Sequence, residues 1–206
     1  KYKKNFSYIL ITSVLGVTIF NSFTYLSLQT SMVINSSIMT SITPLLIIFF
    51  SWLIFKTPTY PRQFLGIILS LIGVIFIISK ANFINLIDLN FTKGDLWMLS
   101  AVFSWGLYSV LLKKIDNTLS QLATLEVMIF FGLIFIFPFY IIETFDNSYF
   151  PKDSNEFLMI SYVAIFASIT SFFAWNKGLS ILGANKASLF FHLIPVFSSI
   201  WAIFFL

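Results

Sequence analysis

Long uncharged hydrophobic stretches alternate with short polar segments along almost the whole chain. No Lys, Arg, Asp or Glu occurs between Asn5 and Phe55, and five later stretches are equally free of charge. Their apolar residues run on without the strict alternation of a barrel strand, which favours helices. A helix needs about 20 residues to cross the hydrocarbon of a bilayer. The pattern therefore predicts seven transmembrane helices, over residues 6–29, 35–55, 64–79, 96–112, 122–142, 157–175 and 187–206.

Composition supports an all-α integral membrane protein. Hydrophobic residues make up 58% of the 206 residues and charged residues only 10%, whereas soluble domains carry about 25% charged residues. A water-soluble fold of this size cannot bury so much apolar surface. The chain has no cysteine, which excludes disulfides and thiol chemistry. Its abundant Phe, Ile, Lys and Asn are typical of AT-rich bacterial genomes, so we expect a multi-pass protein of a bacterial inner membrane.

The basic residues predict the orientation in the membrane. If successive loops lie on alternate sides, nine of the twelve Lys and Arg residues share one side. They fall in residues 1–4, 56–62, 113–114 and 177–186. The other side holds three lysines and six of the eight acidic residues. The positive-inside rule makes the lysine-rich side, and with it residue 1, cytoplasmic. The net charge of +4 is thus a topology signal, and we expect no nucleic-acid partner.

Two proline-containing stretches resemble each other. SSIMTSITPLLII (residues 36–48) and ASLFFHLIPVFSS (residues 187–199) align without a gap and place Pro44 on Pro195, 151 residues further on. The interval spans five predicted helices, an odd number, so the second copy enters the membrane from the opposite face. This is an inverted-topology repeat, which is typical of secondary transporters with a site near the membrane midplane.

The two prolines predict hinges. Pro44 cannot donate a backbone hydrogen bond to the carbonyl of Thr40, and Pro195 cannot donate one to Phe191. In a membrane each freed carbonyl needs a hydroxyl, a water or a neighbouring helix as its partner. A kink that only shapes packing is the alternative, because proline is common in membrane helices. The matched positions favour a bend that lets two bundles rock.

Four segments carry a resemblance to a known family. They are FTYLSLQTSMVINSSIMTSITPLLIIFFSWLIF, RQFLGIILSLIGVIFII, GDLWMLSAVFSWGLYSVLLKK and SFFAWNKGLSILGANKASLFFHLIPVFSSIWAIFFL. The second contains Gly66 and Gly73, and the third opens with Gly-Asp and places Trp105 three residues before Tyr108. In this order over essentially the whole chain, the segments resemble the EamA-type transporters of the drug/metabolite transporter superfamily.

The resemblance implies a fold of ten helices in two inverted five-helix repeats with cytoplasmic termini. This chain would then lack the first two helices and the last, in keeping with its opening Lys and its apolar end. Residues 1–79 would end the first repeat with three helices, 80–93 would be an extracytoplasmic linker, and 94–206 would form four helices of the second repeat. The resemblance also implies transport of small organic metabolites such as amino acids, often with proton exchange and without a cofactor.

Polar and aromatic residues inside the predicted helices are the candidate substrate-binding residues. His192 titrates near neutral pH, and Glu126 is an acid in a membrane helix, where charge is costly and usually functional. The alternatives are a hydrogen bond to a neighbouring helix for His192 and snorkelling to the cytoplasmic surface for Glu126. Trp105 and Tyr108, one turn apart, suit an aromatic wall for an apolar or cationic substrate. Plain packing is the alternative for both.

The remaining candidates follow from the repeat and from helix faces. Asn176 and Tyr25 are paired across the repeat and are expected at the mouths of the cavity. Thr40 belongs to a polar stripe that approaches the midplane from outside, whereas His192 approaches it from inside. We interpret a small-residue face as a helix-packing surface. It consists of Gly66, Ser70 and Gly73.

These features predict a secondary-active transporter, an exporter of small metabolites that works by alternating access with possible proton coupling. The expected partners are the lipid bilayer, a small-molecule substrate and protons, and a homodimer stays open. We expect no metal site, because the chain has one histidine and no cysteine. Two alternatives stay open. One is an intramembrane enzyme with His192 and Glu126 as acid and base, and the other is a scaffold that transports nothing.

Overall fold

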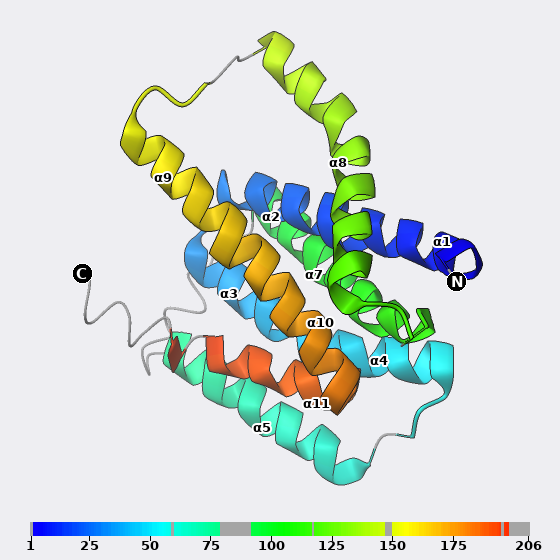
Figure 1. Cartoon of the computed structure of the whole chain (residues 1–206). Coiled ribbons are helices and arrows are strands. Elements are labelled where there is room, and N and C mark those ends of the chain that lie inside the picture. Colours follow the sequence, from blue (N-terminus) through cyan, green and yellow to red (C-terminus); the bar gives the residue numbers. More distant parts are fainter. Residues whose placement is uncertain are drawn as a thin grey trace.

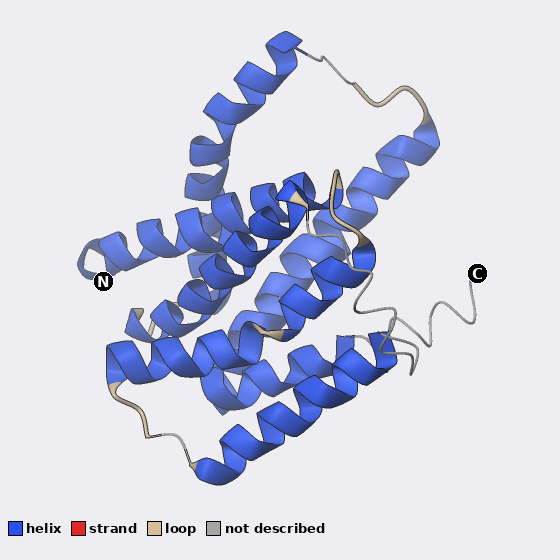
Figure 2. Cartoon of the chain, turned by 180° about the vertical axis from the view of Figure 1, so that it is seen from behind, coloured by secondary structure: helices blue, strands red, loops and turns tan. Residues whose placement is uncertain are grey.

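The computed structural model describes residues 2–58, 60–78, 92–116, 118–146, 150–194 and 196–197, and its regular elements there are all helices (Figures 1 and 2). The first half contains α1 (Tyr2–Thr12), η1 (Ser13–Ile19), α2 (Phe20–Leu28), α3 (Val33–Ser41), α4 (Thr43–Phe55) and α5 (Pro61–Ile78). The second half contains α7 (Lys93–Leu111), η2 (Leu112–Lys114), α8 (Gln121–Asp146), α9 (Ser154–Tyr162), η3 (Val163–Thr170), α10 (Ser171–Leu182), α11 (Ala184–Ala187) and η4 (Ser188–Leu193).

Among the described residues, five helical runs are long and apolar enough to cross a membrane. They are Asn5–Leu28, Asn35–Phe55, Lys93–Lys114, Gln121–Phe145 and Ser154–Leu182. Each coincides with a predicted span, so the helical membrane class is confirmed. The third predicted span falls in α5, whose apolar run Pro61–Gly73 is shorter. Half of the seventh lies outside the described residues, as does nearly all of the predicted linker 80–93. The count of seven and the division into repeats therefore stay predictions.

α7 is the central helix of the bundle. The helices α2, α3 and α4 pack against it, and 56% of an apolar 18-residue stretch within Lys93–Lys114 is buried. Small residues on α7 let its neighbours come close, because a Cβ on Gly106 would lie 3.2 Å from the ring of Phe50. Ala101 is fully enclosed. Without a hydrophobic driving force between helices in lipid, such close van der Waals contact is what holds them together.

Two of the long helices contain a π-helical segment at matching places. η1 joins α1 to α2, and η3 joins α9 to α10. At the spacing of 151 residues that aligns Pro44 with Pro195, η1 falls on residues 164–170, which lie within η3. π-helical segments are rare and occur frequently at functional sites. Because both fall at the same spacing of 151 residues, they favour a common origin for the two helical runs, α1–η1–α2 and α9–η3–α10.

The four lysine-rich segments meet at one end of the bundle, which we call the basic end. In Figure 1 the N-terminus, the α4–α5 loop, the α7–α8 connection and the α10–α11 turn all lie there. Hydrogen bonds join them: the backbone N–H of Asp116 donates to Asn5 (3.2 Å), and Gln121 donates to the hydroxyl of Ser180 (2.7 Å). Loops predicted to share a side of the membrane thus share an end of the molecule, while their cytoplasmic location stays a prediction.

A buried carboxylate closes the opposite end. Asp95, in the first turn of α7, is only 1% exposed. It accepts hydrogen bonds from Asn35 Nδ2 (3.0 Å), from the backbone N–H of Thr92 (2.6 Å) and from the hydroxyl of Ser31. Beside it, a Cβ on Gly94 would lie 2.6 Å from the backbone nitrogen of Ser31. The Gly-Asp pair therefore fastens the α2–α3 hairpin to the start of α7.

Asp95→Asn is expected to loosen this attachment. The amide keeps one acceptor oxygen, and its NH₂ group faces either the Ser31 hydroxyl or the N–H groups of Asn35 and Thr92, so at least one hydrogen bond that the carboxylate accepts is lost. Such a loss costs about 1–3 kcal/mol. We expect a lower melting temperature of the purified protein in detergent. Asp153→Asn, at an exposed cap of α9, is the control. Equal melting temperatures for the two variants would contradict the role of Asp95.

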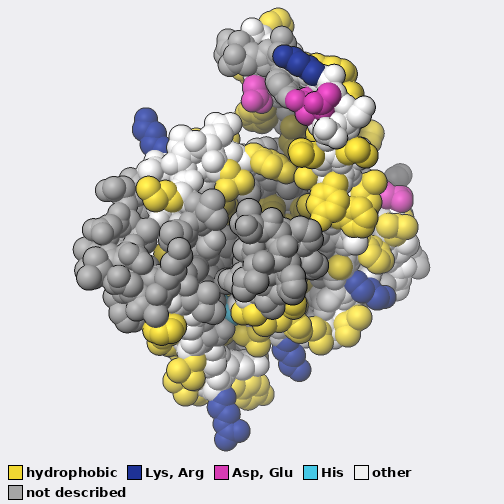
Figure 3. All heavy atoms as spheres, turned by 90° about the vertical axis from the view of Figure 1, so that its left-hand side faces the viewer, with side chains coloured by type: hydrophobic (Ala, Val, Ile, Leu, Met, Phe, Trp, Pro, Cys, Tyr) yellow, Lys and Arg dark blue, Asp and Glu magenta, His cyan; other side chains and the backbone are white. Residues whose placement is uncertain are grey.

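The outer part of α8 and the run α9–η3 present apolar side chains to their surroundings (Figure 3). Only 6% of the span Ser154–Leu182 is buried. Figure 3 shows hydrophobic side chains over this face and acidic side chains gathered near its top, while basic side chains lie both at its lower end and near the acidic ones at the top. An apolar surface of this extent is stable only against lipid or further protein.

Candidate functional site: a polar cavity at the basic end

The predicted aromatic pair lies at the centre of a ring cluster. Trp105 and Tyr108 of α7 are 6% and 0% exposed, and their ring centroids are 5.0 Å apart. Phe20 from α2 packs at 4.3 Å from Trp105, and Phe172 from α10 meets it edge-on at 5.1 Å. Trp175 lies 5.9 Å away. The prediction that Trp105 and Tyr108 act together is consistent with this arrangement, although their role in binding stays untested.

Two side-chain hydrogen bonds tie α7 to α10. The Tyr108 hydroxyl donates to Asn176 Oδ1 at 2.7 Å, and Trp175 Nε1 donates to Ser109 Oγ at 3.1 Å. In a low-dielectric interior both bonds are stronger than in water, and an unpaired partner is costly. They fix the position of Asn176, so three of the predicted substrate-binding residues form one connected group.

The segment η1 comes close to α7 and α8. A Cβ on Gly16 would lie 2.5 Å from the ring of Tyr108, so only glycine fits there without movement. The hydroxyl of Ser104 donates to the carbonyl of Leu15 (2.8 Å), and Thr18 donates to the carbonyl of Gly132 (3.1 Å). The sequence analysis did not single out Gly16. The only indication in the sequence was an isolated glycine within an apolar stretch.

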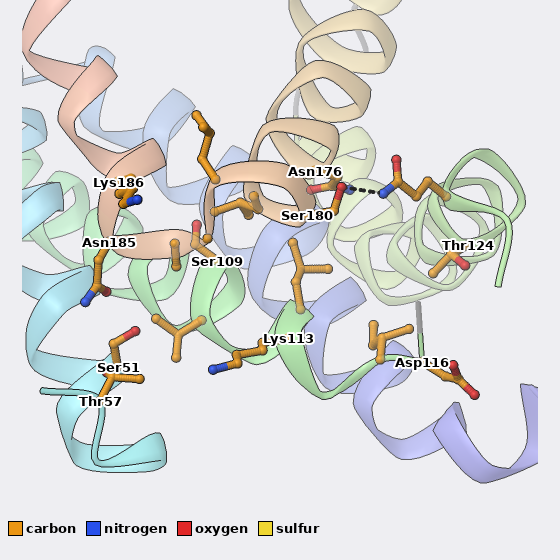
Figure 4. Close-up of a pocket in the computed structure, with 18 of the residues that line it drawn as sticks. Ser51, Thr57, Ser109, Lys113, Asp116, Thr124, Asn176, Ser180, Asn185 and Lys186 are labelled. Atoms are coloured by element: carbon orange, nitrogen blue, oxygen red, sulfur yellow. Dashed lines mark hydrogen bonds between the residues drawn. The ribbon is translucent and has the colours of Figure 1, made fainter. Parts of the chain in front are cut away.

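A cavity of about 420 Å³ opens at the basic end (Figure 4). The ends of α4, α7, α8, α10 and α11 surround it. Its polar lining includes Ser109, Lys113, Gln121, Asn176, Asn185 and Lys186. Asn176 belongs both to this lining and to the bond with Tyr108, so the cavity reaches the edge of the aromatic cluster. Asp95 lies about 27 Å from Lys113 along α7, at a rise of 1.5 Å per residue.

The remaining substrate-binding candidates lie outside this cavity. Thr40 is half-buried on α3 and donates to the carbonyl of Ser36 (2.8 Å). Tyr25 is 57% exposed near the end of α2. Glu126 is exposed on α8, whereas Thr124 and Met128 of the same helix line the cavity. In this conformation the structure therefore does not bring these three candidates to the site, and their roles stay predictions.

His192 is buried away from the cavity. It is 7% exposed on η4, which packs against α3, α4 and α5. Neither ring nitrogen has a hydrogen-bond partner among the described residues. Glu126, by contrast, lies on the exposed face of α8. Nothing in this conformation pairs the two residues as a catalytic acid and base.

Pro44 lies at a break between two helices. α3 ends at Ser41 and α4 begins at Thr43. The Thr43 hydroxyl donates to the carbonyl of Thr40 at 2.5 Å, so the carbonyl that proline leaves free has gained a hydroxyl partner as predicted. The hinge role itself stays a prediction. Pro195, its counterpart, lies outside the described residues.

The predicted packing face of α5 has no partner in the part of the chain that the structure describes. A Cβ on Gly66 or Gly73 would meet nothing within 4 Å. The side chain of Ser70 lies outside the described set. A packing role for this face therefore depends on protein that the structure does not show, and it stays a prediction.

Fold and site together define a multi-pass helical membrane protein with a polar cavity at one end. The chain belongs to the EamA-like transporter family, whose sequence profile matches residues 1–79 and 92–206. The resemblance to EamA-type transporters of the drug/metabolite transporter superfamily is thereby confirmed.

Curated relatives agree with this assignment. The chain is 26% identical over 198 residues to the uncharacterized transporter YyaM of Bacillus subtilis (strain 168), covering 96% of the chain and 65% of the relative. It is 26% identical over 191 residues to an uncharacterized transporter of Archaeoglobus fulgidus, covering 92% and 64%. YetK of Bacillus subtilis (strain 168) is 25% identical over 198 residues, with 94% and 59% covered. The chain thus spans less than two thirds of these relatives. No solved structure matches it significantly.

Proposed function

We propose that the full-length protein is a secondary-active exporter of small organic metabolites, such as amino acids, and that it works by alternating access in a bacterial inner membrane. One observation carries the proposal: a polar cavity opens at the basic end, while a buried carboxylate fastens the opposite end. This is the shape of one of the two states that alternating access requires. Family membership supports a transporter rather than an enzyme.

Two inverted repeats would supply the moving parts. The shared spacing of the two prolines and the two π-helical segments supports such a pair. In the proposed division, residues 1–79 end the first repeat, 80–93 link the repeats, and 94–206 belong to the second. A symmetric pair can expose one site to each side in turn by rocking about its hinges.

The position of the opening supports loading from the cytoplasm. The positive-inside rule assigns the basic end to the cytoplasm, and an exporter needs a conformer that is open on that side to take up its substrate. The cavity of about 420 Å³ falls within the range of small-molecule sites, about 300–1,000 Å³. It suits a single metabolite rather than a polymer.

Proton coupling is assigned to His192 in this proposal. Its two buried nitrogens have no described partner, so a proton that arrives on the ring changes its charge without breaking an existing bond. Of the elements that pack against η4, α3 and α4 carry no charged residue, α5 carries Arg62 and α11 carries Lys186, so none of them offers a carboxylate. An uncompensated charge in such a place costs free energy. Protonation of His192 would therefore destabilise the present packing of η4.

Counterflow in proteoliposomes made with the full-length protein tests the function. We expect a labelled metabolite to accumulate unchanged against unlabelled metabolite, and an imposed pH gradient to accelerate its movement. His192→Asn is expected to retain counterflow and to lose the acceleration. If the pH gradient accelerated transport by His192→Asn as much as by the unchanged protein, the proposed role of His192 would be contradicted. Chemical conversion of the substrate would favour an enzyme, and absence of any movement across a broad metabolite panel would favour a scaffold.

A further inference from the structure

The inner part of the cavity offers hydrogen-bond donors. An amide has an acceptor oxygen with two lone pairs and an NH₂ group with two donors. Asn176 Oδ1 accepts from Tyr108 (2.7 Å), whereas its Nδ2 donates to none of the described residues. Ser109 Oγ accepts from Trp175 (3.1 Å), and its O–H donates to none of the described residues. Both side chains line the cavity. Each oxygen already accepts one hydrogen bond, while the N–H and O–H donors of the two side chains are all unused among the described residues.

The side chains that line the cavity carry a net charge of one positive unit. Lys113 and Lys186 line the cavity together with a single carboxylate, Asp116. Asp116 Oδ1 accepts the backbone N–H of Thr118 at 2.9 Å. Lys113 has no carboxylate partner among the described residues, and its Nζ lies 4.8 Å from the ring centroid of Phe55. In Figure 4 it extends between the side that bears Asn176 and the side that bears Thr57. A cleft with low-dielectric walls focuses such a charge.

The opposite side of the cavity differs in character. Asn185 Oδ1 and Thr57 Oγ1 line it and are buried without a hydrogen-bond partner among the described residues. The Asn185 oxygen can only accept a hydrogen bond, and the Thr57 oxygen can accept or donate. A molecule held between the two sides therefore needs an acceptor group at the Asn176 side and a donor group at the Asn185 side.

We propose that the cavity selects small monoanionic carboxylates that carry a hydroxyl group or another uncharged donor, with Lys113, Asn176 and Ser109 as the residues that recognise the carboxylate. This inference rests on the proposed transport function and names the charge of its substrate. One net cation in the lining balances a monoanion, whereas a phosphate dianion would leave a negative charge uncompensated. Lys113 supplies a charge-assisted hydrogen bond, about twice as strong as a neutral one.

Acid and amide pairs of the same shape test the substrate class. Lactate and lactamide, and 2-hydroxybutyrate and its amide, are compared with alanine in counterflow by the full-length protein. We expect each acid to be exchanged about tenfold or more faster than its amide at low concentration, the effect of losing one charge-assisted bond. The zwitterion alanine is expected to fall between them. Equal rates for acid and amide, or a preference for alanine over both acids, would overturn the proposal.

Two neighbouring lysines provide a matched pair of variants. Lys113 lines the cavity, whereas Lys114 does not, although both ammonium groups lie about equally far from the Phe55 ring (4.8 and 5.0 Å). Lys113→Gln is expected to weaken lactate exchange about tenfold and lactamide exchange much less, because only lactate brings a negative charge to the ammonium group. Lys114→Gln is expected to change neither by more than about twofold. An equal effect of both variants on lactate would mean that only the general basic charge of this end matters.

The outcomes separate this inference from the underlying function. Movement of unchanged metabolites without regard to charge would retain the transporter and remove the carboxylate preference. If none of the acids, amides or alanine moves while a broader metabolite panel does, the substrate class is wrong and the transporter stands. Absence of movement throughout that panel would remove both.

Discussion

Gly16→Val is expected to cause the largest loss of stability among single substitutions near the site. The added Cβ would lie 2.5 Å from one carbon of the Tyr108 ring and 2.6 Å from another. Tyr108 is fully buried and bonded to Asn176, so the ring cannot yield without leaving an unpaired hydroxyl. Overpacking of this kind costs about 1–3 kcal/mol, or more where nothing can relax. Thermal unfolding in detergent and counterflow are the measurements, and we expect both to fall sharply.

Gly66→Val is the matched control. A Cβ at Gly66 meets nothing within 4 Å, and the substitution introduces the same residue into another apolar helix. We expect its melting temperature to stay close to that of the unchanged protein. If Gly66→Val lowered stability as much as Gly16→Val, the close approach of η1 to Tyr108 would not be the cause.

Asn176→Leu is expected to have the second largest effect, and to act on stability and transport together. Leucine leaves the fully buried Tyr108 hydroxyl without a partner, which costs about 1–3 kcal/mol. It also removes the amide from the cavity. Tyr108→Phe is expected to be milder, because it leaves only Asn176, which borders the cavity and can bond to water.

The double variant Tyr108→Phe with Asn176→Leu separates the two effects. Removing both partners avoids an unpaired buried group, so we expect its melting temperature to recover above that of Asn176→Leu alone. Transport should not recover, because the cavity still lacks the amide. Additive losses of stability would show that the hydrogen bond at 2.7 Å does not couple the two residues.

The sequence was informative where membrane physics leaves little choice. Uncharged runs gave the positions of the long helices, because a charge inside lipid is too costly to be scattered at random. Clustered lysines correctly grouped the loops at one end. The helix break at Pro44, with Thr43 bonded to the freed carbonyl of Thr40, followed from the missing N–H of proline. Each of these rests on a local property of the chain.

Contacts between distant residues could not be predicted in the same way. A uniformly apolar helix shows no periodicity, so nothing in the pattern indicated which face of α8 is buried, the face of Thr124 or that of Glu126. Gly16 and Tyr108 meet from separate helices, and no local signal announces such a contact. The π-helical turns were also invisible, since their residues are as apolar as the flanking α-helix. Asp95 was noted only as half of a motif, and its role needed the hairpin beside it.

The two ends of the bundle should respond differently to ionic strength. Every donor that the described residues give to Asp95 is neutral, and the group is sealed from solvent, so dissolved ions have nothing there to screen. At the basic end the lysine side chains that the structure describes are exposed. The electrostatic interactions of such charges are screened beyond about 8 Å in physiological saline. Raising the salt concentration should therefore weaken anion binding in the cavity at the basic end and leave the attachment of the α2–α3 hairpin to α7 unchanged.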